Sequence, residues 1–104
     1  MEITTRNAGE ILVVDLTGSL DTQTSGQASE EITRIVADTN GNSMLMNLEN
    51  LEFLCSAGLR VLLRAAKEFQ AKGGTIKISQ AKGVVKEVLD ISGFGSFLEI
   101  HDSE

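Results

Sequence analysis

Several residue types are scarce in this chain, and each scarcity excludes a class of site. Cysteine and histidine occur once each, as Cys55 and His101, so one chain can form neither a disulfide nor a zinc site of the usual Cys/His kind. The 4 aromatic residues are all Phe, which removes the usual stacking platforms for nucleobases and most aromatic sugar sites. A net charge of −6 argues against nonspecific nucleic-acid binding, which needs a basic surface. We therefore expect no metal, no cofactor and no nucleic-acid partner.

Long apolar runs are also lacking. No stretch approaches the length needed to cross a bilayer, and residues 1–7 lack the basic start and apolar run of a signal peptide. A single cysteine fits a reducing compartment. These features predict a soluble cytoplasmic protein. The 104 residues, 41% of them hydrophobic, suit a single domain over residues 1–104.

Apolar runs of strand length alternate with amphipathic runs of helix length. Strands are predicted at residues 2–7, 11–17, 43–48, 75–79 and 97–100. Helices are predicted at residues 24–39, 57–72 and 82–91. Residues 18–22 are expected to end the second strand, and residues 49–54 to form a loop. The order is β-β-α-β-α-β-α-β, which predicts one α/β domain with a mixed β-sheet and helices packed on it.

The helix predicted at 57–72 begins at a junction that carries one hydroxyl group. Ser56 follows an apolar segment and precedes Ala57 and Gly58, two residues with almost no side chain. One interpretation is that Ser56 caps the helix, because a serine oxygen accepts a hydrogen bond from a free N–H of the first turn. The other is that Ser56 carries a phosphate, because the helix dipole and the free N–H groups favour an anion there. This stretch alone leaves both interpretations open.

Other candidate groups have simpler explanations. Cys55 could act as a nucleophile at the helix start, but the only histidine available as a base is His101, and packing as a small hydrophobe is favoured. The paired carboxylates Glu49 and Glu52 indicate a solvated loop rather than an acid–base pair. The glycines at 73–74 follow a helix, so they indicate a helix end rather than a phosphate-binding loop.

Asp21 follows the second predicted strand and has two possible roles. It could cap the helix predicted at 24–39. It could instead point toward a pocket beside Ser56, because parallel strands bring their carboxyl ends together at the crevice where α/β proteins bind ligands and partners.

Four segments in this order resemble the STAS domain, and most closely the stand-alone bacterial anti-sigma factor antagonists. They are Gly-Ser-Leu-Asp at 18–21, Met-Asn-Leu-Glu-Asn-Leu at 46–51, Cys-Ser-Ala-Gly-Leu at 55–59 and Asp-Ile-Ser-Gly-Phe at 90–94. The resemblance extends from residue 3 to about residue 100, and the four motifs together are more specific than any one of them.

The resemblance implies regulation by partner switching rather than catalysis. Family members bind, when unphosphorylated, an anti-sigma factor that is also a serine kinase of the histidine-kinase ATPase superfamily, and the sigma factor is released. The kinase phosphorylates a serine that matches Ser56, the complex separates, and a PP2C-type phosphatase resets the protein. The motif aspartate is replaced here by Cys55, and the second hydroxyl residue by Ala57. Asp21 matches the aspartate of a Gly-x-Leu-Asp motif at the partner-facing edge.

The same resemblance implies a partner surface and one other possible function, and Cys55 by itself leaves a further function open. The residues expected at the partner surface are Asp21, Cys55, Ser56, Ala57, Gly58 and Arg60. A phosphate there adds a charge of about −1.5 to −2, which a helix start tolerates but a closely packed partner does not. Ala57 and Gly58 are expected to leave the hydroxyl open to a kinase. The alternatives are a STAS-type small subunit of an ABC lipid-transport complex, which binds the ATPase subunit, and a thiol enzyme that uses Cys55.

Overall fold

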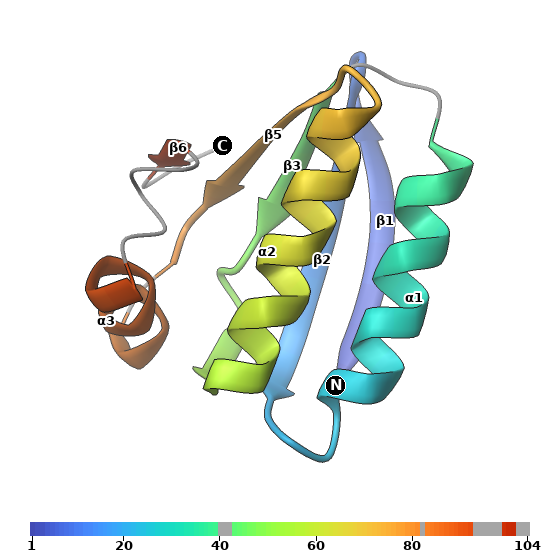
Figure 1. Cartoon of the computed structure of the whole chain (residues 1–104). Helices are drawn as coiled ribbons and strands as arrows, with labels where there is room; N and C mark the ends of the chain where they lie inside the picture. The colour runs from blue at the N-terminus through green and yellow to red at the C-terminus, as the bar shows by residue number, and fades with distance from the viewer. Residues whose placement is uncertain (40–42, 82, 93–98, 102–104) are drawn as a thin grey trace.

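A computed structural model of the chain describes residues 1–39, 43–81, 83–92 and 99–101 (Figure 1). Six strands and three helices lie within these residues. In chain order they are β1 (Glu2–Ala8), β2 (Ile11–Leu20), α1 (Ser25–Asp38), β3 (Ser43–Asn47), β4 (Leu51–Leu54), α2 (Ser56–Ala71), β5 (Thr75–Ser79), α3 (Gly83–Ser92) and β6 (Glu99–His101). The predicted α/β class and the predicted order of elements are confirmed, with β4 as an additional strand.

The sheet is mixed, as predicted. Its main path has the strand order β1-β2-β3-β5-β6. β1 and β2 form an antiparallel hairpin, and Gly9 makes the turn with a positive φ of 66°, which glycine adopts without strain. The pairs β2–β3, β3–β5 and β5–β6 are parallel. The carboxyl ends of these parallel strands therefore lie along one edge, where α/β folds place their functional residues.

The predicted loop at 49–54 is wrong in part, because Leu51–Leu54 form strand β4. β4 pairs in parallel with the last residues of β2, beyond a register shift between Gly18 and Ser19. The predicted strand break at 18–22 is wrong for the same reason, since β2 continues to Leu20. Gly18 has a φ of 104°, a conformation that lets the strand change register and continue.

The other boundaries differ from the predicted ones by small amounts. The helix predicted at 57–72 begins and ends one residue earlier, and the helix predicted at 82–91 is observed at Gly83–Ser92. The strand predicted at 97–100 is observed at Glu99–His101, and residues 82, 97 and 98 lie outside the described residues. Among the described residues, no helix is long and apolar enough to cross a membrane.

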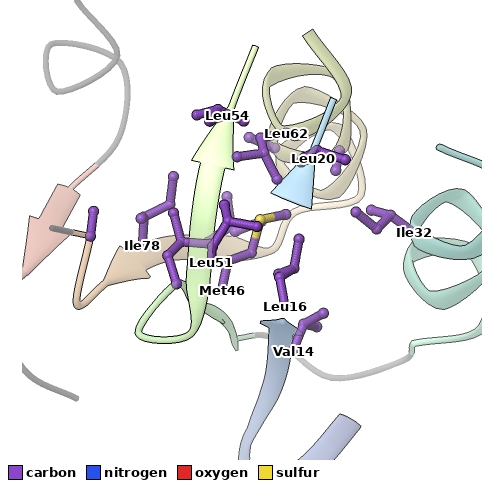
Figure 2. Close-up of a cluster of buried hydrophobic side chains, with 14 of the residues drawn as sticks. Val14, Leu16, Leu20, Ile32, Met46, Leu51, Leu54, Leu62 and Ile78 are labelled. Carbon is purple, nitrogen blue, oxygen red and sulfur yellow. The ribbon is translucent and has the colours of Figure 1, made fainter. Parts of the chain in front are cut away.

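Helices α1 and α2 cover one face of the sheet (Figure 1). Every second residue of the central strands points to this face, as the period of a strand requires. The resulting core includes Val14, Leu16, Met46 and Ile78 from the strands and Ile32 and Leu62 from the helices (Figure 2). Leu20 and Leu54, at the ends of β2 and β4, belong to the same core. These two leucines anchor the point where the candidate site begins.

Candidate functional site

The end of β2 is joined directly to the start of α2. The backbone N–H of Cys55 donates a hydrogen bond of 3.0 Å to the carbonyl oxygen of Leu20. Asp21 and Ser56 each lie one residue beyond this hydrogen bond. The start of α1 lies at the same end of the molecule, the lower end in Figure 1. The fold thus brings two sequence-predicted site residues, Asp21 and Ser56, to one edge of the sheet.

Cys55, and not Ser56, is the N-cap of α2. Cys55 has extended backbone angles, φ −93° and ψ 175°, and its Sγ accepts a hydrogen bond of 3.4 Å from the backbone N–H of Gly58. Ser56 is the first helical residue, so the interpretation of Ser56 as the cap is wrong. The bond to Leu20 holds Cys55 against the end of β2, which places the cap one residue earlier than hydroxyl preference alone suggests.

The side chain of Ser56 is exposed to solvent, whereas the residues next to it in the sequence are less exposed. Cys55 and Ala57 are half-buried and Gly58 is buried. A Cβ atom added to Gly58 would lie 2.6 Å from Cγ of Leu20. Gly58 therefore faces the core, and the expectation that it leaves space around the hydroxyl group is wrong. The exposure of Ser56 follows instead from its position as the first helical residue.

Asp21 organises the loop between β2 and α1. Its Oδ1 accepts hydrogen bonds from the backbone N–H groups of Gln23 and Thr24, at 2.9 and 3.0 Å. The hydroxyl of Thr24 also donates to this oxygen at 3.2 Å. The N-cap position of α1 is Thr24, so Asp21 does not cap that helix. It closes the turn that precedes the helix and fixes the loop beside the start of α2.

These hydrogen bonds, first of all the one from the backbone N–H of Thr24, hold the pKa of Asp21 below its ordinary value. A lowered pKa in the folded state means that ionised Asp21 stabilises the fold at neutral pH. This contribution is present above the unfolded-state pKa of about 3.9 and is lost as the pH falls through the lower folded-state value.

We expect Asp21→Asn to remove this part of the pH dependence, because the amide oxygen can still accept the hydrogen bonds but the side chain no longer titrates. The measurement is the urea midpoint of both proteins between about pH 6 and pH 2.5, a range that spans the ordinary aspartate pKa. Parallel curves for the two proteins across this range would contradict the role given to Asp21.

Two other candidate groups lie apart from Ser56. Glu49 and Glu52 are both exposed and line a groove of about 550 Å³ on the α3 side of β4. Ser56 and Cys55 are not among the residues that line it. Within the part of the chain that the structure describes, no group of three or more His, Cys, Asp or Glu residues could hold a metal ion.

Arg60 was expected at the partner surface, and its side chain is exposed one helical turn beyond Ser56. It lines a shallow hollow on the outer face of α2, together with Leu63, Arg64, Lys67 and Glu68. A set of cationic side chains thus follows the exposed serine along α2, in a chain whose net charge is −6. Arg64 in this set is already paired with Glu68, at 2.9 Å, so Arg60 is the member of the set that lies nearest to the start of the helix.

Comparison with known proteins identifies this fold. The family model for the STAS domain matches residues 2–104. An anti-sigma F factor antagonist from Paenibacillus polymyxa is 31% identical over 94 residues, which cover 90% of this chain and 80% of the relative. The chain therefore belongs to the STAS domain family. Its resemblance to the anti-sigma factor antagonists of that family is confirmed by relatives of that name.

Solved structures show the same fold. An anti-sigma factor antagonist from Mycobacterium paratuberculosis superposes with a TM-score of 0.87 at 20% identity, covering 98% of this chain and 86% of that one. The Bacillus cell fate determinant SpoIIAA in its phosphorylated form gives a TM-score of 0.71 at 22% identity, covering 95% and 90% of the two chains. These likenesses establish the architecture of the chain.

Two features of the site were not foreseen from the sequence. The first is the sulfur atom of Cys55 as the helix cap, since hydroxyl and carboxylate side chains are the usual caps. The second is the close contact of Gly58 with Leu20, which depends on the pairing of β4 with β2. No local sequence pattern predicts either feature. A glycine within the first turn of a helix does, however, indicate that another part of the chain packs closely against the helix backbone there.

Proposed function

We propose that this chain is an anti-sigma factor antagonist that acts by partner switching and has no catalytic activity of its own. In its unphosphorylated form it binds an anti-sigma factor with serine-kinase activity, of the histidine-kinase ATPase superfamily. Phosphorylation of Ser56 separates the complex, and a PP2C-type phosphatase restores the binding form. We place this cycle in the cytoplasm.

One observation carries the proposal. Ser56 is exposed as the first residue of α2, beside the end of β2 and the Asp21 loop. A hydroxyl in this position is accessible to a kinase without unfolding of the helix. The surrounding backbone is held by the Cys55–Leu20 hydrogen bond and by the turn at Asp21. We infer that phosphorylation changes the surface presented to the partner while the fold stays the same.

The covalent step is a phosphoryl transfer from ATP. The Ser56 oxygen attacks the γ-phosphorus, a P–O bond forms, and the bond between that phosphorus and the β,γ-bridging oxygen breaks, so that ADP leaves. The hydroxyl proton passes to a base supplied by the kinase or to solvent. Hydrolysis by the phosphatase later returns the hydroxyl group and inorganic phosphate.

The expected partner surface combines the exposed residues of this edge. Ser56 and Arg60 are exposed, and Asp21, Cys55 and Ala57 are half-buried around them. Gly58 is buried beneath this surface and affects it indirectly, because its contact with Leu20 sets how closely α2 approaches β2. We propose that a partner packs over this surface and is displaced when a hydrated dianion appears at its centre.

The test is labelling with the cognate kinase and ATP, followed by mass mapping of the modified residue. We expect one phosphate per chain, on Ser56, and no labelling of Ser56→Ala. The control is Ser25→Ala, which removes the half-buried hydroxyl at the first position of α1 and should leave labelling unchanged. Labelling of another residue, or stable co-purification with an ABC ATPase subunit in place of a kinase, would overturn the proposal.

A further inference from the structure

Ser56 and Arg60 are four residues apart on one helix, and both side chains are exposed. With 3.6 residues per turn, side chains at this spacing are neighbours on the helix surface, with Cβ atoms about 5–6 Å apart. The order also matters: an anion on the N-terminal residue and a cation four residues later is the favourable arrangement for a helical pair. A phosphate on Ser56 and the guanidinium of Arg60 would have this order.

The side chain of Arg60 makes no hydrogen bond or ion pair with any other residue in the described part of the chain. Other arginines are engaged: Arg64 pairs with Glu68 at 2.9 Å, and Arg6 pairs with Asp15 at 2.9 Å. The guanidinium group of Arg60 is therefore available to an anion nearby. Its side chain is exposed on the outer face of α2, so solvent and not packed protein surrounds the guanidinium group.

We propose that Arg60 is the internal counter-charge for a phosphate on Ser56, an inference that rests on the proposed phosphorylation of that residue. The planar guanidinium can donate two parallel hydrogen bonds to phosphate oxygens, a geometry that a lysine cannot provide. Asp21, on the neighbouring loop, is anionic, and its Oδ1 already accepts three hydrogen bonds. Repulsion from this carboxylate directs the phosphate away from the β2–α1 loop and along α2 toward Arg60.

The pairing changes two properties of the partner surface in one event. In the unmodified protein, Arg60 is an exposed cation available to an acidic group on the partner. In the modified protein, the same guanidinium is held by the phosphate of its own chain. Phosphorylation then adds a dianion and withdraws a cation, and the partner loses a favourable contact as well as meeting repulsion. Arg60 acts here as a positioning residue and not as a catalytic one.

The test installs phosphoserine at position 56 by genetic encoding, so that no kinase is needed, and compares melting temperatures in a double-mutant cycle. The four proteins are the unmodified and the phosphorylated chain, each with Arg60 or with Arg60→Gln. We expect the phosphate to raise the melting temperature by about 3 °C more in the presence of Arg60 than of glutamine. The difference should shrink at about 1 M salt, where exposed charge pairs are screened.

Arg64→Gln is the matched control, because Arg64 lies two turns from Ser56 and is already paired with Glu68. It should give the same response to phosphate as the parent chain. The inference would be overturned if phosphate raised the melting temperature equally in the parent chain and in Arg60→Gln. It would also be overturned if Arg64→Gln reduced this rise in melting temperature as much as Arg60→Gln does. If the kinase labels another residue but encoded phosphoserine still couples to Arg60, the proposed function fails while the pairing stands.

Discussion

Ser56→Asp is expected to weaken binding to the anti-sigma factor by about 100-fold or more, with little change in folding. Burying a charge that has no partner costs several kcal/mol, and a loss of about 3 kcal/mol corresponds to roughly 100-fold in the dissociation constant. The fold should tolerate the substitution, because Ser56 is exposed in the first turn of α2, where a negative charge is favourable. Calorimetric titration with the purified partner gives the affinity, and thermal melting gives the stability.

Two further variants make the result specific to this hydroxyl group. Ser56→Ala should retain binding, because it removes the oxygen without adding a charge. Thr75→Asp places the same charge on an exposed residue at the first position of β5, at the opposite end of the parallel strands. It should bind like the parent chain. Tight binding by Ser56→Asp, or an equal loss of affinity in Thr75→Asp, would contradict the partner surface proposed for the start of α2.

Most elements of the fold were predictable because their side chains follow a clear period. The helix α2 has an apolar face at helical spacing, and β5 alternates between buried and more exposed residues. Strand β4 shows no such signal. It has only four residues, of which the two middle ones, Glu52 and Phe53, are exposed. Its pairing depends on the register shift at Gly18 in a distant strand, and a local pattern carries no information on that partner.

The position of the candidate site was predictable, but its internal geometry was not. A serine between an apolar segment and an amphipathic helix indicated the helix start, and the structure places Ser56 there as the first helical residue. The identity of the cap was decided by tertiary structure, because the Cys55–Leu20 hydrogen bond fixes which residue remains extended. The role of Asp21 also depends on the folded turn. Its carboxylate accepts hydrogen bonds from the backbone N–H groups of Gln23 and Thr24, and the sequence alone allowed a turn there without fixing which N–H groups face the carboxylate.

Gly58→Ala is expected to lower the free energy of unfolding by about 2–3 kcal/mol, and the melting temperature by about 10 °C or more. The new Cβ would lie 2.6 Å from Cγ of Leu20, 2.8 Å from the carbonyl oxygen of Leu20 and 3.0 Å from Cδ1 of Leu54. A leucine side chain can move, but this carbonyl oxygen cannot move freely, because it accepts the hydrogen bond from Cys55. The substitution therefore has to push α2 away from β2 or break that bond.

Gly26→Ala is the matched control, since it makes the same change in α1, where a Cβ would meet nothing within 4 Å. It should raise stability by up to about 0.5 kcal/mol, because alanine has the higher helix propensity. If Gly58→Ala also shifts the start of α2, its loss of partner affinity should exceed what the unfolded fraction explains, since Ser56 and Arg60 move with that helix. An unchanged melting temperature for Gly58→Ala would show that the approach of α2 to β2 is looser than the Leu20 contact implies. In that case the rigid placement of Ser56, on which the switching mechanism depends, would have to come from the Cys55 cap, the Cys55–Leu20 hydrogen bond and the turn at Asp21.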